Sequence, residues 1–275
     1  MSEAKRTKNE IEAFNKTIEK LKEVNRLIEE NKLDEAGREC EGILRADKEN
    51  ASALNSMAVI LNDRGKYAEA LKNLDDALKQ DSLTKEQRAL TLNNKCVSLL
   101  NLKQFKQALD CCNESLGLEP DRKETLNNAG IILTKLGEFE EAIDHLRRAL
   151  RIDPKFYKAL NNLGVALREN RQYDDAIKCY DDALAISKKD VKVLLFNKGV
   201  AYRHKNENEK AIELYEQALK LDKNYKEAQN NIGYAKLNDF VRNLAVKEYE
   251  LAERIDPDFE IAKNNIKILK SLDIF

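Results

Sequence analysis

The sequence has 275 residues, 35% of them charged and 42% hydrophobic, and 48 basic side chains are balanced by 49 acidic ones to a net charge of −1. This balance argues against a protein that binds nucleic acid or an anionic membrane, because such proteins carry a clear excess of basic residues. Three prolines, nine glycines and no tryptophan, with abundant lysine, glutamate, leucine and alanine, are typical of a folded helical protein.

Neither end of the sequence nor its cysteine content points to an oxidising or membrane environment. No apolar run of signal-peptide length follows the first ten residues, and no stretch approaches the roughly 18 apolar residues of a membrane span. The five cysteines are an odd number without CxxC spacing, and we expect them to be free thiols that pack as small apolar side chains. The predicted location is cytoplasmic. The cysteines are Cys40, Cys96, Cys111, Cys112 and Cys179.

A period close to 34 residues runs through the chain. One small residue recurs at intervals of 34, 38, 34, 34, 35 and 34 residues: Ala36, Ala70, Ala108, Ala142, Ala176, Ala211 and Ala245. A glycine series has the same period: Gly130, Gly164, Gly199 and Gly233. Because the three prolines (Pro120, Pro154 and Pro257) also share one position of this period, the chain is predicted to repeat one structural unit.

Each unit is predicted to contain two helices. In the fourth unit, residues 123–136 place apolar side chains at helical spacing, and Gly137 then supplies the left-handed residue that favours a helix end. A second helix follows over residues 139–152, and Pro154 closes it because proline cannot continue a helix. Gly65 has the role of Gly137 in the second unit, and asparagines lie near this turn in other units: Asn31, Asn170 and Asn206.

This pattern resembles the tetratricopeptide repeat (TPR) family, whose unit is a helix–turn–helix of 34 residues. The match is close in the fifth unit, at Leu160, Asn161, Asn162, Leu163, Gly164, Tyr173, Ala176, Tyr180 and Ala183. The resemblance implies an all-α fold, a right-handed α-solenoid formed by a single array over residues 1–275. Its expected units are 17–50, 51–84, 89–122, 123–156, 157–190, 192–225 and 226–259, with an N-terminal helix extension over 11–16 and a capping helix over 260–275.

Some units depart from the repeat. The glycine position holds Val24 in the first unit, Ala58 in the second and Cys96 in the third. The seventh unit has Phe240 where the turn requires glycine or asparagine, so a distorted turn is expected there.

The first helix of each unit is expected to line a long concave face that binds an extended peptide. One position on these helices is repeatedly asparagine, at Asn94, Asn128, Asn162, Asn197 and Asn231. A side-chain amide both donates and accepts hydrogen bonds, so a ladder of amides can hold a peptide backbone. A neighbouring set can supply side-chain pockets: Ile131, Val165, Phe196, Val200 and Tyr234. The alternatives are that the asparagines are a common feature of the family and that the apolar residues contact the adjacent helix.

Other kinds of site are not indicated. The full set of lysines and asparagines of a chaperone-tail carboxylate clamp is missing, since Leu21 precedes Asn25 in the first unit and Ser56 stands in the second. No phosphate-binding glycine loop, HExxH or GxSxG motif occurs, and the paired aspartates fall on second helices. We therefore expect neither an enzyme nor a metal site, and no cofactor.

The leading hypothesis is a non-catalytic scaffold for a protein or peptide segment. The alternative is homo-oligomerisation through the apolar segment 260–275, which light scattering would detect. RNA binding is the weakest hypothesis, since most units place no basic residue on the predicted groove.

Overall fold

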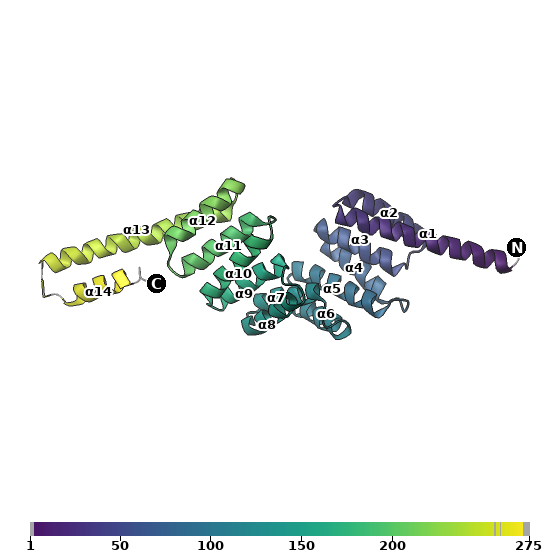
Figure 1. The fold of residues 1–275 in the computed structure, drawn as a ribbon, viewed down its shortest axis with the longest axis horizontal. Helices are drawn as coiled ribbons and strands as arrows, with labels where there is room; N and C mark the ends of the chain where they lie inside the picture. The colour runs from purple at the N-terminus through teal and green to yellow at the C-terminus, as the bar shows by residue number, and fades with distance from the viewer. Residues whose placement is uncertain (1–2, 256, 259, 272–275) are drawn as a thin grey trace. The chain divides into compact units, whose positions relative to one another are not determined.

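The computed structural model is helical and describes residues 3–255, 257–258 and 260–271. It forms two compact units, residues 1–137 and 138–275 (Figure 1). The first contains α1 (Glu3–Glu29), α2 (Leu33–Ala46), α3 (Ala51–Asp63), α4 (Tyr67–Leu78), α5 (Lys85–Asn101), α6 (Phe105–Leu118) and α7 (Lys123–Leu136). The second contains α8 (Phe139–Ile152), α9 (Tyr157–Glu169), α10 (Tyr173–Ile186), α11 (Val191–His204), α12 (Asn208–Leu221), α13 (Lys226–Ile255) and α14 (Glu260–Ser271).

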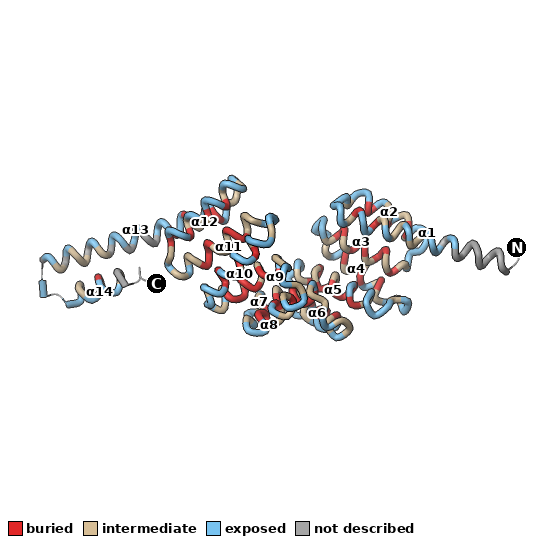
Figure 2. The backbone as a smooth tube through the Cα atoms, viewed as in Figure 1, coloured by how far each residue is buried: buried red, intermediate tan, exposed pale blue. Residues whose placement is uncertain are grey.

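Within each unit, consecutive helices pack as helix–turn–helix pairs, and the first helix of a pair also contacts the first helix of the next. Buried residues recur along the helices of both units, as the red segments of Figure 2 show. This arrangement confirms the all-α repeat fold expected from the sequence. Helix α1 is longer than expected because it begins at Glu3, and the predicted capping helix is α14, with residues 272–275 outside the described range.

One left-handed residue ends the first helix at each of the first six turns. Its φ lies between 59° and 86° at Asn31, Gly65, Lys103, Gly137, Arg171 and Asn206. In the fifth repeat this residue is Arg171. The neighbouring Asn170, which the sequence suggested for this role, has a φ of −81°. The expectation of a left-handed residue at the turn within each pair is therefore confirmed for these six turns. Lysine and arginine also take this position, although the sequence suggested only glycine and asparagine.

The seventh turn does not form. Helix α13 continues for 30 residues from Lys226 to Ile255, through the position where the sequence predicts a distorted turn between two helices. The position 34 residues after Asn206 is Phe240, and a bulky side chain strongly disfavours the left-handed conformation. The expectation of a turn was wrong because the helical conformation, which needs no positive φ, is open to every residue around Phe240.

The two helices of a pair meet at two residues sixteen positions apart, of which the first is glycine, alanine, cysteine or valine. We call these positions the small slot and the large slot. Their occupants are Val24 and Cys40, Ala58 and Leu74, Cys96 and Cys112, Gly164 and Tyr180, and Gly199 and Tyr215, all buried. As the small slot shrinks from valine to glycine, the large slot grows from cysteine to tyrosine. This compensation keeps the helices close-packed with different side chains.

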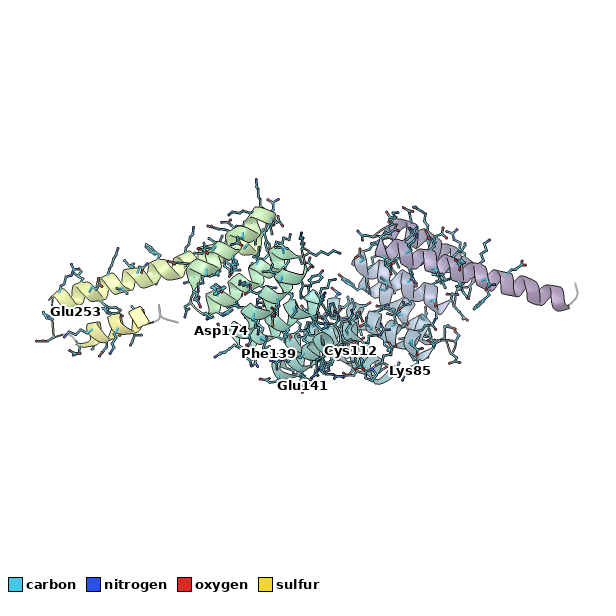
Figure 3. All side chains as sticks on the ribbon, in the orientation of Figure 1. Lys85, Cys112, Phe139, Glu141, Asp174 and Glu253 are labelled. Atoms are coloured by element: carbon cyan, nitrogen blue, oxygen red, sulfur yellow. A yellow bond between two sulfur atoms is a disulfide. The ribbon has the colours of Figure 1, made fainter. Side chains whose placement is uncertain are left out.

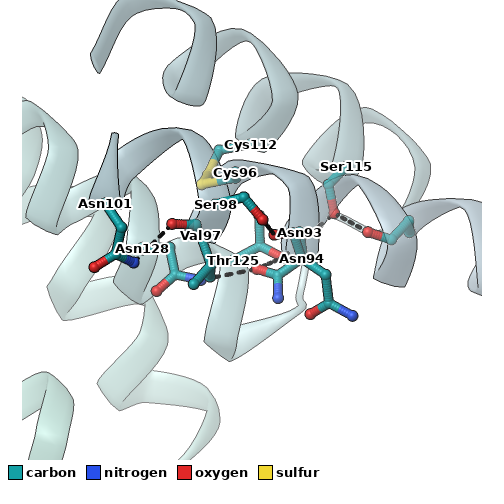
Figure 4. Close-up of a disulfide and its surroundings, with 11 residues drawn as sticks. Asn93, Asn94, Cys96, Val97, Ser98, Asn101, Cys112, Ser115, Thr125 and Asn128 are labelled. Atoms are coloured by element: carbon teal, nitrogen blue, oxygen red, sulfur yellow. Dashed lines mark hydrogen bonds between the residues drawn. A yellow bond between two sulfur atoms is a disulfide. The ribbon is translucent and has the colours of Figure 1, made fainter. Parts of the chain in front are cut away.

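The expectation of free thiols was wrong for one pair of cysteines. Cys96 on α5 and Cys112 on α6 fill the two slots of the third repeat and are joined by a disulfide (Figure 4). Their Cα atoms are 5.9 Å apart, a distance suited to a disulfide, because the slots face each other directly. The sequence spacing of sixteen residues could have revealed this contact. Cys40, Cys111 and Cys179 are free.

Candidate binding surface

Three asparagines of the ladder donate hydrogen bonds to asparagines of the preceding repeat. Asn94 Nδ2 donates to Asn55 Oδ1 at 3.0 Å, and Asn128 Nδ2 donates to Asn93 Oδ1 at 3.0 Å. In the second unit, Asn197 Nδ2 donates to Asn161 Oδ1 at 2.9 Å. In each case the ladder asparagine of one repeat reaches the residue before the ladder position in the preceding repeat.

Asn93 is the centre of a buried polar network in the first unit (Figure 4). Its Oδ1 accepts a second hydrogen bond, from Thr125 Oγ1 at 3.0 Å. Ser115 lies 3.3 Å from Thr125 and donates to the backbone carbonyl of Ala89 at 2.8 Å. The asparagines one position before the ladder, Asn55, Asn93 and Asn161, are therefore structural acceptors that hold adjacent first helices together.

Half-buried apolar side chains lie one helical turn from these amides. Val97 follows Asn94 on α5, and Ile131 follows Asn128 on α7, and each keeps part of its surface exposed. In the second unit, Val165 has the same place after Asn162 on α9. We call these amides and aliphatic side chains the amide strip of each unit.

The remaining predicted pocket residues lie elsewhere. Val200 is buried and Phe196 packs against the same core, with ring centroids 5.6 Å from Tyr215 and 5.2 Å from Tyr225. Tyr234 is exposed on α13. Asn231 Nδ2 donates to the backbone carbonyl of Glu227 in its own helix, at 3.1 Å. The ladder residues of α5, α7, α9 and α11 therefore lie on the strips, whereas Val200 is buried in the core and Phe196 is half-buried against it.

Two arginines missed as site candidates continue the strip of the second unit. Arg168 and Arg203 lie 35 residues apart, at equivalent positions of α9 and α11. Arg168 comes seven residues after Asn161 and therefore lies on the same helix face. Its side chain is only 14% exposed and pairs with Glu169 at 2.6 Å. Nε of Arg203 is buried without a hydrogen-bond partner. Their spacing of one repeat could have identified them.

The two tyrosines of the large slot, Tyr180 and Tyr215, lie within the electrostatic influence of these arginines. Tyr180 and Tyr215 are fully buried, and neither hydroxyl has a hydrogen-bond partner. Burial raises the pKa of Tyr215 to about 12, against a smaller lowering by the positive charge of Arg203. Both tyrosines are therefore neutral at physiological pH.

Chemistry other than binding has little support in the described residues. They contain no group of three or more His, Cys, Asp or Glu side chains placed to hold a metal ion. The charged side chains seen in Figure 3, such as Asp174 on α10, instead form surface ion pairs. Across the described ranges, none of the helices combines the length and apolar character needed to cross a membrane.

Three sequence models of the repeat match the chain. Two are described as tetratricopeptide repeat and cover residues 156–224 and 50–79, and one described as TPR repeat covers residues 130–170. Among curated protein sequences, none matches.

Solved structures share the fold at low sequence identity. A chain of the APC/C hetero-tetramer Cut9–Hcn1 is 21% identical with a TM-score of 0.72, and the match covers 80% of this chain but only 42% of that one. A tetratricopeptide repeat protein from Parabacteroides merdae is 18% identical with a TM-score of 0.63, covering 92% of this chain and 98% of that one. YrrB, a TPR protein with an unusual peptide-binding site, is 21% identical with a TM-score of 0.51, covering 70% and 96%.

The 34-residue period and the helix–turn–helix pairs agree with these matches, which show tetratricopeptide repeats over residues 50–79 and 130–224.

Proposed function

We propose that the chain is a non-catalytic scaffold that binds an extended segment of a partner protein along the amide strips. The observation that carries this proposal is the bonding of the asparagines to one another, as between Asn128 and Asn93. These bonds order the amides before a ligand arrives, which lowers the entropy lost on binding. A primary amide has a second N–H and a second lone pair beyond such a bond, and these can pair with a peptide backbone.

The aliphatic side chains of the strip supply the apolar part of the interaction. Val97 and Ile131 are half-buried and lie outside the core clusters of the first unit, so their exposed surface is available to a side chain of the peptide. In the second unit, Arg168 and Arg203 lie along the strip and favour a peptide with acidic residues. Many modest contacts on an ordered surface are consistent with affinities of about 1–100 µM.

The proposal can be tested by selecting random twelve-residue peptides displayed on phage against the full chain. We expect selected peptides to bind in the micromolar range and to lose at least tenfold in affinity to the Val97→Lys/Ile131→Lys variant. A matched control carries the same added charge on exposed positions of α6, Gln107→Lys/Asn113→Lys, and should bind as the unmodified chain does.

Two results would contradict the proposal: no peptide enriched, or peptides that bind the strip variant and the unmodified chain equally. Since Val97 and Ile131 are partly buried, thermal melting must show that the variant folds. Val97→Ala/Ile131→Ala provides a milder replacement if it does not.

A further inference from the structure

The glycine of the fifth repeat's small slot brings a buried tyrosine close to an arginine. Cζ of Tyr180, the ring carbon that bears the hydroxyl, lies 2.7 Å from the place a Cβ would take on Gly164. Arg168 follows Gly164 by four residues and therefore lies one turn further along the same face of α9. Burial raises the pKa of Tyr180, and the positive charge of Arg168 partly opposes this rise.

The same arrangement recurs one repeat later. Cζ of Tyr215 lies 3.2 Å from the place a Cβ would take on Gly199, and Arg203 follows Gly199 by four residues. Burial raises the pKa of Tyr215, and the charges of Arg203 and Arg168 both oppose it. Because both arginines act on one tyrosine, their guanidinium groups belong to a single site on the adjoining helices α9 and α11.

The buried polar atoms of this site that have no partner can all donate hydrogen bonds. Among the described residues, none accepts a hydrogen bond from the Tyr180 hydroxyl, the Tyr215 hydroxyl or Nε of Arg203. A guanidinium group has no acceptor atom, so the arginines cannot satisfy the tyrosine O–H groups. The site therefore needs an acceptor, and an oxyanion is the acceptor that also compensates positive charge.

A glutamate of the chain itself already contacts one of the two arginines. Oε1 of Glu169 accepts hydrogen bonds from Nε and Nη2 of Arg168, at 3.2 and 2.6 Å. The Glu169 side chain is nearly half exposed, whereas that of Arg168 is mostly buried. Arg203 forms no ion pair with a described residue, and its Nη2 lies 3.5 Å from Nε2 of His204. A carboxylate is thus compatible with the site, and only one of the two arginines has one.

The charges of the site favour a ligand with a single negative charge. Arg168 and Glu169 compensate each other, and Arg203 leaves one positive charge. His204 is neutral at physiological pH because burial, followed by the charges of Arg203 and Arg168, lowers its pKa. One positive charge matches a carboxylate, whereas a phosphorylated side chain carries a charge of about −1.5 to −2.

We propose that Arg168 and Arg203 together bind the carboxylate of an acidic side chain in the partner segment, and that Glu169 competes with it for Arg168. This inference rests on the proposed function and adds the chemical class of one residue of the bound segment. The slots hold the tyrosine hydroxyls next to the guanidinium groups. A carboxylate oxygen between the arginines therefore supplies the acceptor that these donors lack.

The site is tested first with a small probe that does not depend on peptide binding. N-acetylglutamic acid α-amide carries one carboxylate, on a glutamate side chain, and N-acetylglutamine amide is its neutral match. In nitrogen-15 spectra of the full chain, we expect the acid to shift the Nε–Hε signal of Arg203 saturably, with a Kd in the millimolar range. The neutral amide should not shift it, and inorganic phosphate at equal ionic strength should bind no more tightly than the acid.

Charge variants separate the proposed competition from a structural role. Glu169→Gln should tighten binding of the acid about threefold to tenfold, because it frees Arg168, and a purely structural ion pair would not give this gain. Arg203→Gln should abolish the binding, and Arg203→Lys, which keeps the charge but loses the planar fork, should weaken it and serves where the glutamine variant does not fold. Arg151→Gln removes an exposed arginine of α8 and is the matched control, which should bind the acid as the unmodified chain does.

The partner segment is tested with twelve-residue peptides on phage that are random except for a fixed central glutamate. A selected peptide is then synthesised with glutamate, glutamine or phosphoserine at that place, and with an amidated C-terminus so that a terminal carboxylate cannot contribute. For the unmodified chain, glutamine should lower the affinity about tenfold, and phosphoserine should not raise it. For Arg203→Gln, the glutamate and glutamine peptides should differ by less than about twofold.

Three results would overturn the carboxylate site: an Arg203 signal that does not respond to the acid, unchanged affinity in Glu169→Gln, or tighter binding of phosphate or of the phosphoserine peptide. The last would assign the site to a phosphate group. If no peptide is selected while the acid binds at Arg203, the proposed peptide binding fails and the carboxylate site stands. If peptides are selected but their glutamate and glutamine forms bind equally, peptide binding stands and recognition of an acidic side chain is refuted.

Discussion

A Cβ atom on Gly164 would lie 2.6 Å from Cε1 of Tyr180, so the ring occupies the space that any other residue on α9 would need. The ring is fully buried and cannot move into solvent. Gly199 and Tyr215 have the same relationship, also at 2.6 Å. Glycine at this slot therefore serves the close approach of two helices and not backbone flexibility.

The first prediction concerns this contact. Gly164→Ala should destabilise the chain by about 1–3 kcal/mol, because overpacking outweighs the gain of up to about 1 kcal/mol from replacing glycine in a helix. Urea or thermal unfolding measures the change. Gly117→Ala is the control, since a Cβ there meets nothing within 4 Å and alanine should be neutral or stabilising.

A compensating change tests the cause. The second repeat fills the same slots with Ala58 and Leu74, so Gly164→Ala/Tyr180→Leu should recover part of the lost stability. If the double variant loses more unfolding free energy than the two single variants lose together, the sizes of the slot residues do not determine the packing.

The second prediction concerns the disulfide between Cys96 and Cys112. Reduction should lower the stability of the first unit by roughly 3 kcal/mol, the value for closing a loop of about 15 residues. Melting with and without a non-thiol reductant measures this. The melting temperature of the Cys112→Ala variant should not depend on the reductant. Five free thiols in protein purified without reductant would disprove the bond.

The fold was largely predictable from the sequence because one period sets the helix pairs, and the small residues mark where the helices meet. The site was less predictable. The ladder containing Asn197 could be read from the sequence, but the hydrogen bond from Asn197 to Asn161 depends on the offset between successive first helices. The sequence also does not show that Tyr225, beyond the end of its own helix pair, packs against the half-buried ring of Phe196.

The third prediction separates structural asparagines from exposed ones. Asn93→Ala should destabilise the chain by about 1–3 kcal/mol, since the buried Thr125 hydroxyl and the Asn128 amide both lose their acceptor. Asn101→Ala should change stability by less than about 0.5 kcal/mol, because Asn101 is exposed and bonds only within its own helix. Equal effects in denaturant unfolding would refute the buried network.

The fourth prediction is a pH dependence at His204, whose ring stacks on Tyr173 with centroids 5.6 Å apart. Burial, followed by the charges of Arg203 and Arg168, lowers the pKa of His204 from its usual 6.5. The folded state thus prefers the neutral ring, and this contribution is complete above pH 6.5 and is lost as the pH falls through the lowered pKa.

Melting temperatures between pH 8 and 5 check this expectation. His204→Gln should reduce the loss of stability on acidification, while His145→Gln, the change at the other histidine, should leave it in place. An identical slope in the unmodified chain and the His204 variant would contradict the assignment.

The fifth prediction is that Phe240 keeps α13 straight. Spin labels at Lys226 and Glu253, 27 residues apart, should be about 40 Å apart in a continuous helix of 1.5 Å rise per residue. Phe240→Gly supplies the left-handed residue found at the other six turns and should allow the helix to fold back, so that Gly233 can receive Tyr249 and the labels come within about 20 Å. Phe240→Ala is the control: it removes the same ring, cannot easily take positive φ, and should keep the long distance. A short distance in the unmodified chain would show that the turn forms despite Phe240.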